Sequence, residues 1–464
     1  MPTPKNGSTK VIWISAVALL ALASTFRPAS AAVDEQQGDI YQTTQAYVSQ
    51  FYPLWFTFNQ TRFAQFRPNI IIGPDKISPI YHYVVAINND TVYASSFLDL
   101  SAEPVVLDIP ETNAHYSVLT LDPYCDIFQS AIKPPAPGKF VLYGPGFKGS
   151  LPDELHKVPV PFDYITIIFR ADKFTNGVDM TSEAEVFRQS LHTAPLCAYL
   201  GERCPDGVPL GGDAAIVPEI LFAVPFKTTA DTLIAVEPIA FLRQLQHAVL
   251  SPRTPPMSPK VQALSNRFNA LFARVSENRA EFARGAQAAH YAIVNNYLNH
   301  LGRTNWITYD NIGDWGPHVV QRSSITEFIQ YANDRNTAAY YHAFKDQTGA
   351  PLNGTDPKGY VLTFSPKEIP ETTRFWSLTA YTPEAIELVP NSADKYLVAS
   401  YIPPHANPDG SISIYLARQR PAGVLDSNWL PIPFGPFNVM LRDYGPAGDV
   451  ARRTYVPPGI LKAQ

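Results

Sequence analysis

Five polar side chains crowd into six consecutive positions at the point where a strand is predicted to begin. They are Asn88, Asn89, Asp90, Thr91 and Tyr93. Polar groups at this density are costly to bury unless they bond one another or a ligand. The motif is therefore the best candidate site in the sequence. We expect Asp90 to be a catalytic carboxylate and the other four residues to bind a ligand.

A second carboxylate follows a later predicted strand. That strand ends at Leu121, Asp122 comes next, and Tyr124 is a further candidate ligand-binding residue. If this strand pairs with the one after Asp90, the two carboxylates approach one another. A pair with separated pKa values would suit glycoside hydrolysis, lyase chemistry or another general acid–base reaction. The alternative is structural, because Asp and Asn also cap turns by bonding nearby backbone amides.

Three arginines stand at the ends of apolar elements: Arg170, Arg322 and Arg442. A guanidinium in such a place either pairs with a buried carboxylate or binds an anionic substrate. We predict ligand binding for Arg170 and Arg442, with structural pairing as the alternative.

Several common catalytic motifs do not fit. Gly144 to Gly149 has the glycine spacing of a dinucleotide site, but Pro145 and Pro152 oppose the helix that such a site requires, so a loop is predicted. The sequence has no Gly-x-Ser-x-Gly, His-Glu-x-x-His or Cys-x-x-Cys motif, and its ten histidines are scattered. We predict neither a cofactor nor a metal.

The elements that must position these residues fall into three groups. Alternating or β-branched runs predict antiparallel strands at 105–109, 116–121, 140–143 and 164–169, and again at 360–364, 374–381, 396–402, 411–418 and 437–444. Helical periodicity predicts helices from Pro238, after an N-cap at Ser258, over 281–301 and over 324–332. An earlier helix over 42–52 is expected to stop at Pro53. The predicted fold is mainly β with a helical insert, namely two antiparallel, jelly-roll-like β-sandwiches.

Spaced motifs in this order resemble a known tandem of families. Asn88 to Tyr93 with Leu98-Asp99-Leu100, then Gly144-Pro145-Gly146 and Arg170, resemble the family called domain of unknown function twelve fifty-four. Residues 360–458 are similar to its usual companion, domain of unknown function twelve fourteen. The resemblance implies two sandwiches with helices between them, and no particular activity. The predicted division is a signal peptide at 1–31, an N-terminal domain at 32–230, a helical region at 231–345 and a C-terminal domain at 346–464.

The N-terminus predicts export. Lys5 and Lys10 precede an apolar run over 11–23, and Ala29-Ser30-Ala31 offers a cleavage site. The run is too short to span a bilayer, so no membrane association is expected after cleavage. Cys197 and Cys204 could close a disulfide in an oxidising compartment, whereas Cys125 should be buried and inert. Asn59, Asn89 and Asn353 fit the glycosylation pattern. We expect a secreted protein, or a periplasmic one in a bacterium.

The amino-acid composition limits the classes of binding partner that we expect. The net charge is −5 and no basic block occurs, so nucleic acid is not expected as a partner. Aromatic residues make up 12% of the chain, including 24 tyrosines, which suits either thick β-sheet cores or a sugar-binding cleft. Two hypotheses remain open: a glycan-acting hydrolase or lyase with carboxylates in an inter-domain cleft, and a non-enzymatic carbohydrate- or surface-binding protein. The expected partner is a small molecule or a glycan.

Overall fold

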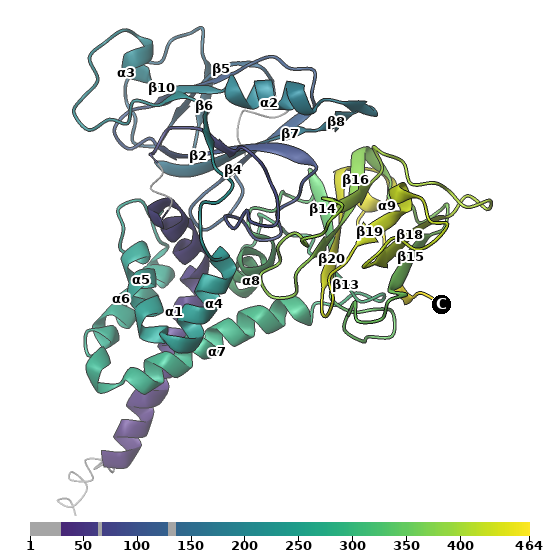
Figure 1. Cartoon of the computed structure of the whole chain (residues 1–464). Coiled ribbons are helices and arrows are strands. Elements are labelled where there is room, and N and C mark those ends of the chain that lie inside the picture. The colour runs from purple at the N-terminus through teal and green to yellow at the C-terminus, as the bar shows by residue number, and fades with distance from the viewer. Residues whose placement is uncertain (1–28, 64–66, 129–135) are drawn as a thin grey trace, which may run out of the picture.

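The computed structural model describes residues 29–63, 67–128 and 136–464, and its course is shown in Figure 1. Helix accounts for 28% and strand for 26%, so the fold is mixed α/β and the prediction of a mainly β protein was too narrow. The predicted signal peptide lies outside the described residues except for 29–31. In the described part of the chain, no helix combines the length and apolar character that crossing a bilayer requires.

The N-terminal β-unit consists of two five-stranded sheets that share one core. The first has the order β12-β1-β2-β7-β4 and is formed by β1 (Ile72–Pro74), β2 (Thr91–Asp99), β4 (Tyr116–Leu121), β7 (Tyr164–Asp172) and β12 (Ala215–Val217). The second has the order β11-β10-β3-β5-β6 and is formed by β3 (Val105–Ile109), β5 (Gly138–Tyr143), β6 (His156–Pro159), β10 (His192–Pro195) and β11 (Gly212–Asp213). The unit is completed by hairpin β8 (Phe174–Thr175) with β9 (Val178–Asp179), and by helices α2 (Thr181–Gln189) and α3 (Leu196–Tyr199).

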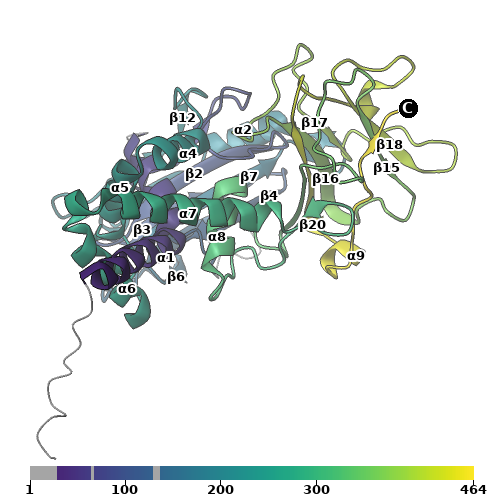
Figure 2. The ribbon, with the colours of Figure 1, turned by 90° about the horizontal axis from the view of Figure 1, so that it is seen from below.

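Helices form a layer against both β-units. They are α1 (Ala29–Phe63), α4 (Phe226–Val236), α5 (Pro238–Val249), α6 (Pro259–Phe272), the short 3₁₀ turn η1 (Val275–Glu277), α7 (Arg279–Leu298) and α8 (Val319–Ile329). The predicted start at Pro238 is confirmed, as is the cap at Ser258, whose hydroxyl accepts from the amide of Val261. Helices α2 and α4 were not predicted. Figure 2 shows α7 extending from the other helices toward the C-terminal sheets.

Helix α1 corrects the prediction that Pro53 ends a helix. The helix continues ten residues beyond it, to Phe63. Proline cannot donate to the carbonyl four residues earlier, which is that of Ser49. The Ser323 hydroxyl of α8 donates to this carbonyl instead, at 2.9 Å, and Arg322 donates to the next carbonyl, that of Gln50, at 2.7 Å. Tertiary hydrogen bonds thus satisfy the carbonyls around the proline.

The C-terminal β-unit also consists of two sheets around one core. A five-stranded sheet of order β13-β14-β20-β16-β17 is formed by β13 (Trp306–Ile307), β14 (Ala338–Ala343), β16 (Thr372–Tyr381), β17 (Leu397–Ala399) and β20 (Asn438–Pro446). A four-stranded sheet of order β19-β18-β15-β21 is formed by β15 (Tyr360–Phe364), β18 (Ile412–Ala417), β19 (Trp429–Pro431) and β21 (Leu461–Lys462), and the short turns η2 (Asp426–Asn428) and α9 (Gly448–Ala451) complete the unit.

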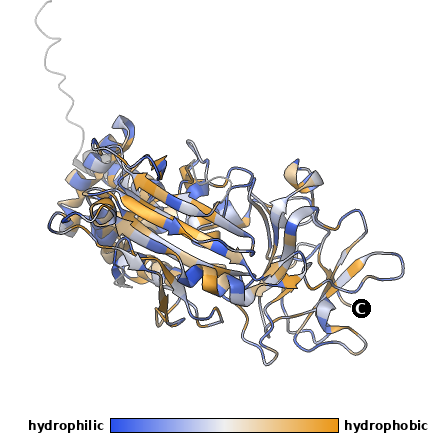
Figure 3. Cartoon of the chain, turned by 90° about the horizontal axis from the view of Figure 1, so that it is seen from above, coloured by the Kyte–Doolittle hydropathy of each residue, from blue (hydrophilic) through white to orange (hydrophobic). Residues whose placement is uncertain are grey.

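The strand predictions are confirmed at all nine positions, with small shifts at several ends. Most neighbouring strands are antiparallel, but β1 with β12, β5 with β6, and β18 with β19 are parallel. None of the sheets closes on itself, and these strand orders do not establish a jelly roll. Figure 3 shows hydrophobic residues concentrated along the strands.

The largest core lies where the helices meet both β-units. It joins side chains of α1 and α4–α8 to the segment 81–87 and to one face of β14, β16 and β20. Strands β13 and β14, within the predicted helical region, belong to the C-terminal sheet. Helix α1, within the predicted N-terminal domain, packs with the other helices.

The predicted disulfide and the predicted burial of Cys125 are confirmed. Cys197, in α3, forms a disulfide with Cys204. Cys125 is buried and has no disulfide partner, and burial raises the pKa of its thiol to about 12. The glycines of 144–149 lie in a loop that leads to strand β6, in agreement with the prediction.

Candidate functional site

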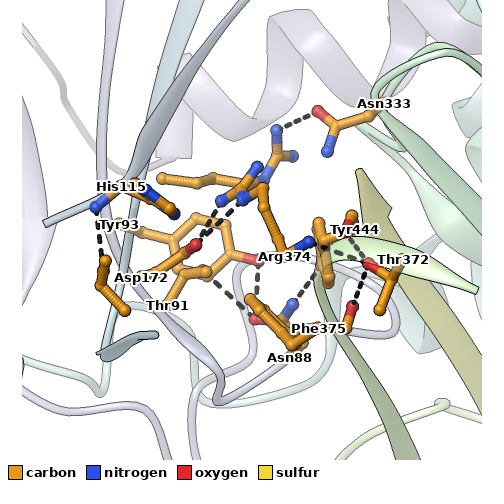
Figure 4. A network of polar contacts seen from close by, with 12 residues as sticks. Asn88, Thr91, Tyr93, His115, Asp172, Asn333, Thr372, Arg374, Phe375 and Tyr444 are labelled. Atoms are coloured by element: carbon orange, nitrogen blue, oxygen red, sulfur yellow. Dashed lines mark hydrogen bonds and ion pairs between the residues drawn. The ribbon is translucent and has the colours of Figure 1, made fainter. Parts of the chain in front are cut away.

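The polar motif lies where β2 meets the C-terminal unit. Asn88 is buried, and its amide donates to the Tyr444 hydroxyl of β20. The Asn88 Oδ1 atom accepts from Tyr93 at 3.0 Å and from Thr91 at 3.3 Å. Figure 4 shows these four side chains converging across the junction. Asn88 therefore links the two β-units.

Asp90 also reaches across the junction. Its carboxylate accepts from the Ser377 hydroxyl at 2.6 Å and from the Tyr401 hydroxyl at 2.7 Å. Burial raises the pKa of Asp90, and these two bonds and the charge of Arg442 offset part of that effect. Both oxygens are engaged and the residue is fully buried. This geometry fits a structural anchor rather than a carboxylate that meets a substrate.

A buried ion pair completes these contacts. Asp172, at the end of β7, accepts from Arg374 of β16 through both carboxylate oxygens, one of them at 2.9 Å from Nε (Figure 4). The Tyr381 hydroxyl also donates to the carbonyl of Ile87 at 2.7 Å. We use the name interdomain clasp for the following set: Asn88, Asp90, Asp172, Arg374, Ser377, Tyr401 and Tyr444.

The structure does not bring Asp90 and Asp122 together. Strands β2 and β4 do not pair, because β7 lies between them. Asp90 precedes the pair of Thr91 with Asp172, whereas Asp122 follows the pair of Leu121 with Thr166. Six residues of β7 separate these positions, or about 20 Å along an extended strand. The paired-carboxylate geometry expected from the sequence is therefore absent for these two residues.

Asp122 organises a turn. Its Oδ1 atom accepts from the amides of Tyr124 and Asp126, both at 2.9 Å. Burial and the neighbouring Asp126 raise the pKa of Asp122 to about 7. Arg322 pairs with Asp126 at 3.2 Å and covers the Tyr124 ring at 4.8 Å. Asp122, Tyr124, Asp126 and Arg322 thus have the structural roles that were the alternative to catalysis and ligand binding.

A cavity of about 800 Å³, including its mouth, lies beside the clasp between the two β-units. Every second side chain of a strand points to the same face, so alternate residues of the strands form the cavity walls. Thr166, Ile168 and Arg170 line it from β7, while Arg442 and Tyr444 line it from β20. Arg170 and Arg442, which are 272 positions apart in the sequence, thus share one cavity with Tyr93. The tyrosines at 81, 83 and 340 add further aromatic wall.

The two arginines are held differently. Arg170 donates to the Asn333 side chain and to the Tyr331 carbonyl, both at 2.6 Å, and lies 5.4 Å from the centre of the Tyr93 ring. Arg442 Nη2 donates to the carbonyl of Ala86, and its Nη1 has no hydrogen-bond partner among the described residues. Both side chains are almost fully buried.

The cavity wall offers few groups for proton transfer. Among the described residues that line it there is no Asp, Glu or His. Burial raises the pKa of Tyr81, Tyr340 and Tyr444, so these hydroxyls stay protonated near neutral pH. The arrangement is suited to binding and orienting a molecule, and less suited to general acid–base catalysis.

A second group of ionisable residues could hold a metal in principle. One ligand atom each from Asp231, His290 and Glu327 lies within 4.8 Å of the others. Lys227 already lies 2.7 Å from Asp231 and 2.6 Å from Glu327. Burial alone would lower the pKa of His290, but contacts with both carboxylates raise it to about 9. With two cations and two anions the cluster neutralises itself, which favours a structural ion network.

The remaining predicted residues have local roles. The Asn89 side chain accepts from Lys173 at 2.6 Å, beside a second, polar cavity of about 600 Å³ that Thr91 also lines. The next residue of its glycosylation triplet, Asp90, is buried. Asn59 is buried in α1 and donates to the carbonyl of Trp55. Of the three acceptor positions, half-buried Asn353 has the most open surroundings, next to exposed Thr355.

Sequence reasoning missed part of the site. Asp172 and Arg374 gave no motif, and Tyr340 lies in a segment that was assigned to the helical region. One signal was present: Arg170 lies two residues after Ile168 on β7, and Tyr93 lies two residues before Ser95 and four before Phe97 on β2, so each shares a strand face with other cavity residues. Recognising this required the pairing of β2 with β7, in which the two residues lie directly opposite each other.

Comparisons with known proteins found two family models and solved structures that resemble this chain. The family model described as protein of unknown function (DUF1254) matches residues 69–195, and that described as protein of unknown function (DUF1214) matches residues 337–448. The crystal structure of the VPA0106 protein from Vibrio parahaemolyticus is similar, with a TM-score of 0.58 and 17% identity over 92% of this chain and 100% of that one. A putative uncharacterized protein from Burkholderia cenocepacia aligns at a TM-score of 0.42 and 14% identity, over 93% of this chain and 94% of that one. No curated protein matches the chain.

Proposed function

Because the chain belongs to the tandem family that joins a DUF1254 domain to a DUF1214 domain, both described as proteins of unknown function, we propose its function from the site itself. The protein binds a small organic molecule in the cavity between its two β-units. One observation carries this proposal: both family domains contribute aromatic and arginine side chains to the same cavity. A largely apolar cavity with a few convergent polar groups is the usual form of a small-molecule site.

The interdomain clasp supports this proposal. Asn88 donates to Tyr444 and accepts from Tyr93, and these two tyrosines line the cavity. Their positions, and hence the cavity shape, depend on contacts between the two domains. A preformed cavity binds its ligand without the entropic cost of ordering its walls. The clasp thus acts as a scaffold for binding.

The residues of the cavity wall are better suited to binding a molecule unchanged than to hydrolysing it. A glycan-acting hydrolase or lyase with Asp90 and Asp122 would need both carboxylates at the bound sugar. Asp90 is occupied by two hydroxyls, and Asp122 bonds two backbone amides in a turn. A non-enzymatic carbohydrate-binding role keeps support from the tyrosine wall, because sugar rings pack well on aromatic faces.

We further propose that this binding takes place outside the cytoplasm. The charged and apolar N-terminal pattern favours export. The disulfide between Cys197 and Cys204 is consistent with an oxidising compartment. We also propose that each pair of sheets is a β-sandwich, a reading supported by the single core that each pair encloses.

A cavity-filling substitution tests the proposal. Ser95 lines the cavity from β2, and Ser95→Trp would occupy part of its volume. The matched control is Ser182→Trp, on the exposed surface of α2. Native mass spectrometry against a panel of aromatic acids, aromatic amides and acidic and neutral oligosaccharides would identify binders and show whether they are recovered unchanged.

We expect at least one class to bind the wild type and the Ser182→Trp control, and to lose most of its affinity for Ser95→Trp. Binding should also raise the midpoint of thermal unfolding, by RT ln(1 + [L]/Kd) in free energy. Undiminished binding to Ser95→Trp would place the ligand elsewhere. Recovery of a chemically altered probe would instead support an enzyme.

A further inference from the structure

The charges at the cavity wall indicate which class of molecule binds there, an inference that rests on the proposed function. We propose that the ligand is an organic monocarboxylate, whose carboxylate binds Arg442 Nη1 while its aromatic or aliphatic body lies along the tyrosine wall. Arg170 contributes a second positive charge to the same cavity.

Arg442 is the central observation. Its side chain is buried in the middle of β20, with an exposed fraction of 3%. One nitrogen, Nη2, donates to the Ala86 carbonyl, and the guanidinium carbon lies 5.5 Å from the centre of the Tyr381 ring. The other terminal nitrogen, Nη1, is buried without a hydrogen-bond partner in the described part of the chain. An unsatisfied buried donor on a charged group is unfavourable, and a bound anion would satisfy it.

The surrounding carboxylates do not neutralise both arginines. Neither Arg170 nor Arg442 forms an ion pair within 4.0 Å with any described residue, whereas Asp172 is already paired with Arg374. Asp90 remains as a buried anion near Arg442, and its two oxygens bond Ser377 and Tyr401. Two cavity guanidiniums therefore face one longer-range carboxylate, which leaves a positive potential at the wall.

The rest of the wall defines the body of the ligand. Phe97, Ile168 and Ile329 supply apolar surface, and Tyr81 and Tyr340 supply rings with a polar edge. The described wall residues include no acidic group that would recognise an amine. A planar carboxylate suits a guanidinium that has one free terminal nitrogen, and an apolar body suits the aromatic surface.

Matched acid and amide probes separate this inference from the proposed function. We would measure the affinity of 4-phenylbutyrate and of 4-phenylbutanamide for the full-length wild type at pH 7 by titration calorimetry. The two molecules share a body and differ in charge. We expect the acid to bind at least 10-fold more tightly, and the variant Arg442→Met to weaken the acid about 30-fold and the amide less than 3-fold. The control Arg303→Met, at an exposed position, should change neither affinity.

Each outcome has a distinct meaning. Equal affinities for acid and amide in the wild type, both lost in Ser95→Trp, would overturn the anion inference and keep the proposed function. Failure of both probes, and of shorter and longer pairs of the same kind, to bind would overturn the anion inference, and the proposed function would fall with it only if the oligosaccharides of the wider panel also failed to bind. If Arg442→Met does not fold, the wild-type comparison still decides the matter. As a second check, Arg442→Lys should keep part of the preference for the acid, because it retains the charge but not the planar donor.

Discussion

Removing one member of the pair between Asp172 and Arg374 should destabilise the protein far more than removing both. The Asp172 carboxylate is almost fully buried, and Arg374 is the described residue that forms an ion pair with it. Arg374→Met would leave this charge unpaired, which typically costs about 3 to 5 kcal/mol of the free energy of unfolding. In Asp172→Asn with Arg374→Met both charges are gone, and we expect a loss of only about 1 to 2 kcal/mol.

The assay is chemical denaturation of the wild type, the two single variants and the double variant at pH 7. The expected coupling energy is roughly 2 kcal/mol or more. A pH series adds a second check. Burial raises the pKa of Asp172, and the charge of Arg374 lowers it in part, so loss of Arg374 should raise this pKa further. A carboxyl whose folded-state pKa is raised destabilises the fold as pH rises above its unfolded value. Arg374→Met should therefore recover stability relative to the wild type as pH falls toward 4. Additive effects of the two substitutions, or a deficit that does not depend on pH, would refute this reasoning.

Three further predictions concern the helices and the disulfide. The pKa of His290 is raised to about 9, so the contribution of its charge to stability is complete below the unfolded-state pKa of 6.5 and is lost as pH rises through 9. His290→Gln should therefore lower the free energy of unfolding by on the order of 2 kcal/mol at pH 6.5 and by little at pH 10, as measured by urea unfolding. Ser323→Ala should cost about 1 to 2 kcal/mol in the same assay, because it leaves the carbonyl opposite Pro53 without a donor, and an unchanged midpoint would contradict this role. Cys204→Ser should lower stability by roughly 2 to 3 kcal/mol under oxidising conditions, and the difference should vanish when wild type and variant are both reduced.

Local patterns in the sequence predicted the elements well. The predicted limits 116–121 and 360–364 match those of β4 and β15 residue for residue, and Ser258 caps α6 as its type and position indicate. These features depend on a few neighbouring residues. The Pro53 prediction failed because the donor that replaces its missing amide, Ser323, lies 270 residues away in the sequence.

The site depended more strongly on topology. The motif at Asn88–Tyr93 was chosen for its density of polar groups, and several of these groups bond the C-terminal domain, which lies about 300 residues later. The proposed partnership of Asp90 with Asp122 required β2 to pair with β4, and β7 occupies that place. Conversely, Arg170 and Arg442 were each predicted to bind a ligand without being predicted to lie together. Only the arrangement of β7 and β20 places them in one cavity. The spacing of two residues along the chain does not indicate that they will line the same cavity.

The most direct test is an experimental structure of the protein crystallised with 4-(4-bromophenyl)butyrate, in which anomalous scattering locates the bromine. We expect the bromophenyl ring to lie among the tyrosines of the interdomain cavity, with a carboxylate oxygen within hydrogen-bonding distance of Arg442 Nη1. A bromine site elsewhere on the molecule, with the cavity filled only by water, would contradict it.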